Sequence, residues 1–423
     1  MKNPFRRDDT GVARVTVAIG VSSAAGLALQ ALVGRMLTPA EFALFLSFWG
    51  MLFAIGGSLS ILEQETARQT AAHEDDSGSS MYGVTVSAAV LAGLVAAATM
   101  IPPIAERFYG RSNWAMGLVV VFAAVGFAIQ FALRGTLIGS GAIRPYSAIV
   151  ILEAVARLVL LLIFAVSFGV NLPTAAIAVG IGSFAWLVWF RRAHGTVPRE
   201  RLSSRQWRTA LRTAASLMVA AGLMAVMIVG YPAMVSSLTD EPPSAARGAV
   251  LAALTLSRFP LILVSPIQAL AVPTIVRWRS NATAASARKA RLLVTGGTLA
   301  ATAVGLVGGV AGWLWGPAVV RLVYGSDYDA SPRAAALLVL SAFLLAWVLL
   351  MSAALIALAA HRRMVVMWLA AVVASAVWLL VSPLGIMDTT AVGALVAPVV
   401  ALACAIPKLW SLMRPGPLPD PTT

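Results

Sequence analysis

Charged side chains inside long apolar runs are the residues of this sequence that could do chemistry. Glu153 and Arg157 stand four residues apart in the run 146–170, so on a helix both lie on one face. Arg258 lies in the run 248–273 and has no acid three or four residues away. A guanidinium at membrane depth is costly unless it is paired or faces water, where it can bind an anion such as a phosphate.

Each of these groups has a structural alternative. Glu153 and Arg157 can form a self-neutralising pair that only helps helices pack, or they can belong to a binding site, and both interpretations stay open. Arg258 can have a partner on another helix. We favour the interpretation in which Arg258 is unpaired, faces a water-filled cavity and binds an anionic substrate.

Four further arginines lie near the ends of apolar runs. Arg14 and Arg35 flank the run 12–34 and are candidate substrate-binding residues, with snorkelling of the side chain to the membrane interface as the alternative. Arg134 and Arg144 flank the connection that precedes the run 146–170. We interpret this second pair as signals of membrane topology.

Prolines interrupt two of the runs. Pro232 lies in 210–236, and three prolines, Pro260, Pro266 and Pro273, lie in 248–273. Each proline removes a helix hydrogen bond and can kink the helix. We predict kinks that take part in gating a transport pathway, with kinks that merely shape packing as the alternative.

The elements that carry these residues are membrane spans. Hydrophobic residues make up 60% of the 423 residues and charged residues 11%, against about 25% charged in ordinary soluble domains, which excludes a soluble globule. A spanning helix needs about 20 apolar residues. Twelve runs qualify: 12–34, 42–62, 81–103, 114–134, 146–170, 173–190, 210–236, 248–273, 292–314, 334–358, 364–383 and 389–407. The sequence therefore predicts an all-α polytopic membrane protein with twelve transmembrane helices.

The connections between the runs are short, and the longest basic one divides the chain. We expect an N-terminal six-helix bundle at 1–190, a cytoplasmic basic linker at 191–209 and a C-terminal six-helix bundle at 210–407. Residues 408–423 should form a cytoplasmic tail that is largely disordered, because prolines recur through its last nine residues.

The net charge of +14 reflects the orientation of the spans. With a cytoplasmic N-terminus, 23 of the 31 Lys and Arg residues fall on the cytoplasmic side and 6 on the outer side, as the positive-inside rule requires. We therefore place both termini in the cytoplasm and take anionic membrane lipids, rather than nucleic acid, as the partner of this charge. Abundant Ala and Arg with few Lys residues indicate a bacterial plasma membrane protein.

The sequence offers no convincing catalytic or metal-binding set. The histidines, His73, His194 and His361, are scattered, and Cys404 is the single cysteine. No metalloprotease, serine-hydrolase or phosphate-loop pattern is present. A membrane glycosyltransferase would be expected to carry carboxylates in its first outer loop, which here offers only Glu41. We predict a protein that is not an enzyme and has no cofactor.

Four stretches resemble the polysaccharide flippases of the multidrug/oligosaccharidyl-lipid/polysaccharide exporter superfamily. At positions 38 and 43 the chain has Thr and Ala where the family usually has glycine. The stretches are Gly34-Arg-Met-Leu-Thr-Pro-Ala-Glu-Phe-Ala-Leu-Phe45, then 134–144 with Leu152-Glu-Ala-Val-Ala-Arg157, then Ser257-Arg-Phe-Pro-Leu-Ile-Leu-Val-Ser-Pro-Ile-Gln268, and Tyr324-Gly-Ser-Asp-Tyr-Asp329.

This resemblance implies two six-helix bundles around a central cavity that opens alternately to each side of the membrane. It implies a lipid-linked glycan with an anionic polyprenyl-pyrophosphate head as cargo, bound by cavity cations. Arg258 is the first residue to which that role carries over, followed by Arg157 and Arg35. A polysaccharide polymerase or glycosyltransferases are candidate partners in the cell envelope.

Two other functions remain as alternatives. A cation- or proton-coupled multidrug antiporter of the same superfamily would need a free carboxylate in its cavity. Glu153 is the acid that lies well inside a predicted span, and Arg157 is expected to neutralise it. A non-transporting membrane scaffold of a polysaccharide assembly complex would have no hydrated central cavity.

Overall fold

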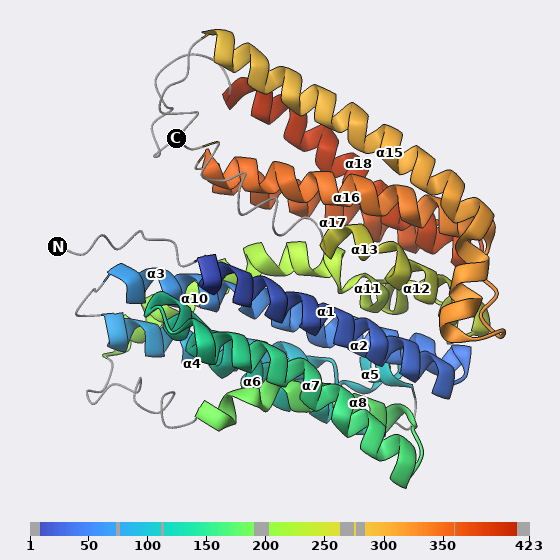
Figure 1. Cartoon of the computed structure of the whole chain (residues 1–423), viewed down its shortest axis with the longest axis horizontal. Helices are drawn as coiled ribbons and strands as arrows, with labels where there is room; N and C mark the ends of the chain where they lie inside the picture. The colour runs from blue at the N-terminus through green and yellow to red at the C-terminus, as the bar shows by residue number, and fades with distance from the viewer. Residues whose placement is uncertain are drawn as a thin grey trace. The chain divides into compact units, whose positions relative to one another are not determined.

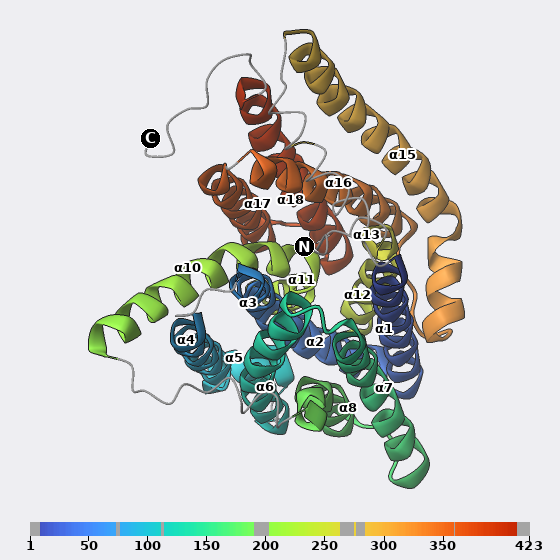
Figure 2. The same ribbon diagram turned by 60° about the vertical axis from the view of Figure 1, so that its left-hand side comes forward.

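The computed structural model consists of helices (Figures 1 and 2) and describes residues 9–72, 77–110, 114–189, 203–262, 275, 284–358 and 360–412. Eleven helices within these ranges are long and apolar enough to cross a membrane. They confirm the predicted all-helical polytopic fold. The expected span 248–273 is described only as far as residue 262, so its second half lies outside the described residues.

The chain divides into two compact units, between Ser244 and Ala245. Unit 1 contains α1 (Asp9–Met36), α2 (Pro39–Leu59), α3 (Ile61–Ala72), α4 (Ser77–Ala98), α5 (Pro102–Tyr109), α6 (Trp114–Gly139), α7 (Ile143–Ser167), α8 (Leu172–Gly180), the 3-10 helix η1 (Ile181–Trp189), α10 (Ser204–Ile228) and α11 (Tyr231–Leu238). Unit 2 contains α12 (Ala245–Ser257), α13 (Phe259–Ile262), α15 (Ala284–Tyr324), α16 (Pro332–Ala357), α17 (His361–Val381) and α18 (Ile386–Leu412).

This division differs from the expected one at 191–209, because the seventh span packs on the first six. Helices α10 and α11 lie against α2, and α10 also lies against α4 (Figure 2). Small residues allow the close approach: a Cβ at Gly50 would lie 3.1 Å from the backbone nitrogen of Ala233, and one at Gly57 would lie 2.6 Å from the Cβ of Ala225. The buried hydroxyls of Ser47 and Ser236 share a hydrogen bond across the same contact.

Several helices begin where the sequence supplies a cap. Thr38 and Glu41 form a capping box in front of α2, with Pro39 in the first turn. Asn171 and Thr174 do the same for α8 and confirm the expected short turn between the fifth and sixth spans. Glu41, the only acid of the first outer loop, is thus a helix cap.

Three helices are longer than the apolar runs predicted. The second span continues through α3, so that Pro39–Ala71 forms one 33-residue candidate span instead of ending at residue 62. Helix α15 extends the expected span 292–314 in both directions to 41 residues. Helix α18 continues to Leu412, so residues 408–412 of the expected tail are helical, with Leu409 fully buried.

Glycines set the closest helix contacts in each unit. In α6, a Cβ at Gly135 would lie 2.5 Å from the carbonyl oxygen of Glu63, and one at Gly139 would lie 2.6 Å from the carbonyl oxygen of Ala67. These two glycines therefore bring α3 against α6. In α15, Gly305, Gly308, Gly309 and Gly312 face α16, and their spacing is typical of a close contact between two helices.

Two of the predicted proline interruptions are present. The seventh span breaks at residues 229–230 between α10 and α11, and Pro232 lies in the first turn of α11. The eighth span breaks at Arg258 between α12 and α13, where Pro260 follows. Pro266 and Pro273 lie outside the described residues.

Candidate functional site

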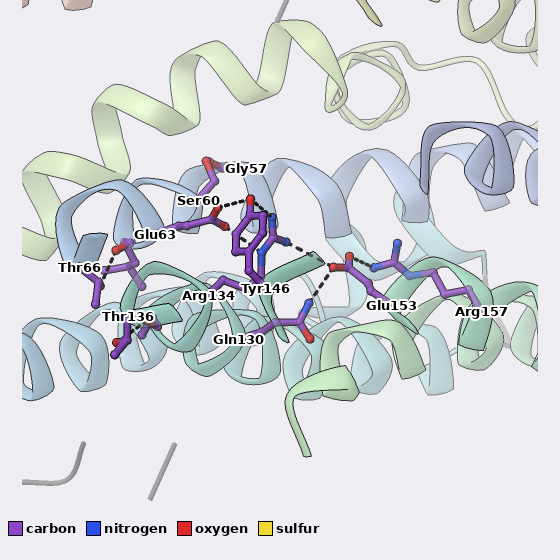
Figure 3. Close-up of polar contacts among 12 residues, drawn as sticks. Gly57, Ser60, Glu63, Thr66, Gln130, Arg134, Thr136, Tyr146, Glu153 and Arg157 are labelled. Atoms are coloured by element: carbon purple, nitrogen blue, oxygen red, sulfur yellow. Dashed lines mark hydrogen bonds and ion pairs between the residues drawn. The ribbon is translucent and has the colours of Figure 1, made fainter. Parts of the chain in front are cut away.

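A chain of polar side chains runs through the interior of unit 1 (Figure 3). Its members come from the consecutive helices α6 and α7 and from α3, which lies about 40 residues earlier in the chain. We call the following six residues the charge network: Glu63 of α3, Gln130 and Arg134 of α6, and Tyr146, Glu153 and Arg157 of α7.

Arg134 joins the two carboxylates of the network. Its Nε lies 2.9 Å from Glu63 Oε2, and its Nη1 lies 3.5 Å from Glu153 Oε2. The hydroxyl of Tyr146 donates a hydrogen bond of 2.8 Å to Glu63 Oε1 and accepts one of 3.4 Å from Arg134 Nη2. Arg134 therefore holds α3, α6 and α7 together.

Arg157 occupies the other end of the network. Its Nη2 donates to Glu153 Oε1 at 2.5 Å, and its Nε donates to the carbonyl of Val179 in α8 at 3.0 Å. Its guanidinium carbon lies 4.9 Å from the ring centre of Phe53. Space for the side chain depends on a glycine, because a Cβ at Gly182 would lie 2.2 Å from Arg157 Nε.

The network is electrically balanced, with two carboxylates and two guanidiniums. Glu153 and Arg157 are 8% and 7% exposed, and Gln130 also donates to Glu153 Oε2 at 2.8 Å. Isolated charges at this depth would carry a large desolvation cost, which mutual pairing offsets. The predicted pairing of Glu153 with Arg157 is confirmed, and the Nε and Nη2 groups of Arg157 both donate to protein acceptors.

The sequence interpretation missed four of the six residues of this network: Glu63, Gln130, Arg134 and Tyr146. Arg134 was expected to be a topology signal, but it is an ion-paired group whose side chain is only 14% exposed. Glu63 lies one residue past the end of the predicted run 42–62, and in the structure it is part of α3. One signal was present: Gly135 and Gly139, four residues apart, are typical of a close helix contact beside Arg134.

Arg258 lies at the break between α12 and α13 and is half-buried. Its backbone carbonyl accepts a hydrogen bond from the nitrogen of Leu261 at 3.0 Å. The expectation that Arg258 is unpaired was wrong, because the residue has an interaction partner in the structure. An arginine has five N–H donors, so its side chain can contact the protein and a ligand at the same time.

The remaining candidates do not join the charge network. Arg14 and Arg35 are exposed near the two ends of α1, and Arg35 has an interaction partner. Among the described residues, no group of three or more His, Cys, Asp or Glu side chains could hold a metal ion.

No protein-family model matches the chain, but full-length relatives exist. The uncharacterized protein Rv3630 of Mycobacterium tuberculosis is 32% identical over 399 residues, which cover 92% of this chain and 90% of the relative. The uncharacterized protein Rv1510 of the same species is 31% identical over 416 residues, covering 94% and 91%.

Solved structures identify the fold. An inward-facing multidrug resistance MATE family transporter of the MOP superfamily matches with a TM-score of 0.64 at 15% identity, over 95% of this chain and 98% of the other. An outward-facing one matches with 0.57 at 14% identity, over 95% and 96%. A MOP superfamily transporter from Pyrococcus furiosus, described as having a binding pocket of reverse polarity that suggests a different function, matches with 0.55 at 15% identity, over 95% and 96%. The chain thus belongs to the family of Rv3630 and Rv1510 and has the multi-pass membrane fold of the MOP superfamily transporters.

Proposed function

We propose that this protein is a flippase that moves lipid-linked oligosaccharide or polysaccharide precursors from the inner to the outer leaflet of a bacterial plasma membrane. The observation that carries the proposal is Arg258 at the break between α12 and α13. It is an arginine inside an apolar span of a MOP fold, next to backbone groups that Pro260 leaves without helical partners.

The chemistry of the cargo fits such a residue. A polyprenyl-pyrophosphate head is anionic and hydrated, so its unassisted passage through about 30 Å of hydrocarbon is very unfavourable. A guanidinium replaces water around the phosphates with bidentate, charge-assisted hydrogen bonds. The prenyl tail stays in the bilayer while the head crosses.

Alternating access supplies the movement in this proposal. MOP superfamily transporters of this fold have been solved in inward-facing and outward-facing conformations. Rocking of helical bundles around a site near the membrane midplane would present the bound head to each leaflet in turn. The breaks at Pro232 and Pro260 are where we expect the seventh and eighth spans to bend.

The charge network argues against a cation-coupled drug antiporter. Such a transporter needs a carboxylate that can take up H⁺, Na⁺ or a cationic drug. Glu63 and Glu153 are both ion-paired with buried arginines, so a cation would have to displace a guanidinium from either one. In the proposed flippase, Glu153 and Arg157 hold α6, α7 and α8 in place rather than contact the cargo, and Arg35 and Arg14 remain candidate contacts at the membrane surfaces.

Arg258→Ala is the test of this proposal. The purified protein is reconstituted into liposomes with a fluorescent, pyrophosphate-linked short-chain prenyl sugar, and flipping is followed as the fraction that dithionite quenches. We expect Arg258→Ala to slow flipping roughly 10–100-fold, because one charge-assisted hydrogen-bonding group is lost. Arg258→Lys, which keeps the charge without the bidentate geometry, should be intermediate.

Arg321→Ala is the matched control. Arg321 is an arginine of the same unit that is 48% exposed and pairs with the exposed Asp329, so its loss should leave flipping unchanged.

Normal flipping by Arg258→Ala would remove Arg258 from the mechanism. Protein that flips nothing but drives H⁺- or Na⁺-dependent drug efflux, abolished by Glu153→Gln, would replace the flippase by the antiporter. If well-folded protein showed neither flipping nor drug efflux, the result would favour the non-transporting scaffold.

A further inference from the structure

The charges of unit 2 are separated by sign along its helices. The three acids among residues 245–412 are Asp327, Asp329 and Asp388, and they gather where α15 ends and where α16 and α18 begin. Arg321 pairs with Asp329 there at 3.4 Å, and Arg333 pairs with Asp388 at 3.5 Å. No acid is left for the opposite end of these helices.

That opposite end is basic. We call the following seven residues the basic end: Arg288, Lys289 and Arg291 in α15, His361, Arg362 and Arg363 in the first turn of α17, and Lys408 in the last turns of α18. Our proposed orientation places it on the cytoplasmic side.

Helix packing brings the members of the basic end to one level. Helices α15 and α16 run antiparallel (Figure 1), with Trp347 Nε1 donating to Thr298 Oγ1 at 2.8 Å. The start of α15 therefore lies beside the end of α16 at Ala357, and α17 begins four residues later. Helices α17 and α18 also pack along each other.

Three cations of the basic end, Arg288, Lys289 and Arg362, are exposed and have no acidic partner among the described residues. Arg363 Nη1 is buried without a hydrogen-bond partner in the same part of the chain. In unit 1, by contrast, Arg134 of α6 pairs with Glu63, and Arg68 of α3 pairs with Glu65.

Exposed apolar side chains begin directly next to these cations. Leu292 and Leu293 in α15 are 62% and 73% exposed, one turn after Arg288 and Lys289. A cation next to an exposed leucine within one helical turn is typical of the level where headgroups meet acyl chains. A soluble anion or a nucleic acid would not match the apolar part of this surface.

We infer that the basic end is a binding surface for anionic phospholipid headgroups, formed by the starts of α15 and α17. The lipid phosphates supply the acceptors that the described residues of unit 2 do not provide to these cations, and the acyl chains cover the leucines. This surface is separate from the proposed contact at Arg258, so it does not depend on which substrate the protein moves.

Lipid titration of the purified full-length protein tests the inference. Phosphatidylglycerol or phosphatidylcholine is added to protein in a neutral detergent, and bound lipids are counted by native mass spectrometry while thermal stability is recorded. We expect phosphatidylglycerol to bind more tightly than phosphatidylcholine and to raise Tm. Each Lys or Arg near an anionic lipid surface contributes a similar amount to the binding affinity. Arg288→Gln and Arg362→Gln should therefore each weaken phosphatidylglycerol binding about fivefold.

The control variants distinguish the loss of a positive charge at the basic end from a general loss of protein stability. Arg321→Gln and Arg333→Gln remove the same charge at the acidic end and should leave lipid binding unchanged. Arg288→Lys should bind lipid nearly as well as the wild type. Equal binding of the two lipids, or equal losses from changes at the two ends, would overturn the inference. So would exclusive binding of a prenyl pyrophosphate at the basic end, which would make it part of the substrate path.

Discussion

At the scale of single residues, the network shows how a membrane protein tolerates buried charge. Glu153 has three donors around it, from Gln130, Arg134 and Arg157, whereas Arg157 has Glu153 as its only ion-pair partner among the described residues. The two members of the pair are therefore not equivalent. Loss of the Glu153 carboxylate leaves Arg157 without its ion-pair partner and Arg134 with Glu63 alone, whereas loss of Arg157 leaves Glu153 paired with Arg134.

This asymmetry predicts unequal costs in stability. We expect Glu153→Gln to reduce the free energy of unfolding by roughly 3–5 kcal/mol, as breaking a buried pair does, and Arg157→Met to reduce it by less. Because Glu153→Gln/Arg157→Met leaves a smaller charge imbalance, the double variant should cost less than the sum of the two. Unfolding of the purified variants in detergent, followed by tryptophan fluorescence, measures all three. Additive costs would contradict the proposed coupling.

At the scale of elements, close helix contacts decide which charges meet. Glu63 can reach Arg134 because Gly135 and Gly139 let the backbone of α3 approach α6. The contact is with backbone atoms, which cannot move aside as a flexible side chain can. Helix α3 must therefore shift when a side chain is added to α6 at either glycine.

Gly135→Ala should destabilise the protein by about 1–3 kcal/mol, as overpacking of a core does. The control is Gly20→Ala in α1, where a Cβ would meet nothing within 4 Å, and it should be neutral or slightly stabilising. Thermal melting of the two variants provides the comparison. If Gly135→Ala melted like the wild type, the close contact of α3 with α6 would not be what positions Glu63.

At the scale of the whole molecule, we expect charge to set the orientation in the membrane. The positive-inside rule predicts that the start of α10 lies in the cytoplasm and the turn between α15 and α16 outside. In a Cys404→Ser background, a membrane-impermeant maleimide should label Ser326→Cys in spheroplasts and Ser204→Cys only in inside-out vesicles. Both serines are exposed, so that access to the reagent depends on the side of the membrane. The reverse pattern would invert the orientation, and with it the side assigned to the basic end.

Composition and local pattern determined much of this protein without a structure. Runs of about 20 apolar residues require helices in a bilayer, since every backbone group must be satisfied within the segment. The spacing of Glu153 and Arg157 determined their pairing, because residues four apart share a helix face. Thr38, Asn171 and the glycines of α15 likewise act over a few residues, so their caps and contacts could be predicted.

Only the tertiary structure decided which distant residues meet. Glu63 and Arg134 are 71 positions apart, and nothing in either local sequence states that α3 packs on α6. The docking of α10 and α11 on α2 was hidden for the same reason. The sequence of a membrane span is enough to predict that it is a helix. Which residue of another helix pairs with its charged side chain is determined by how the helices pack.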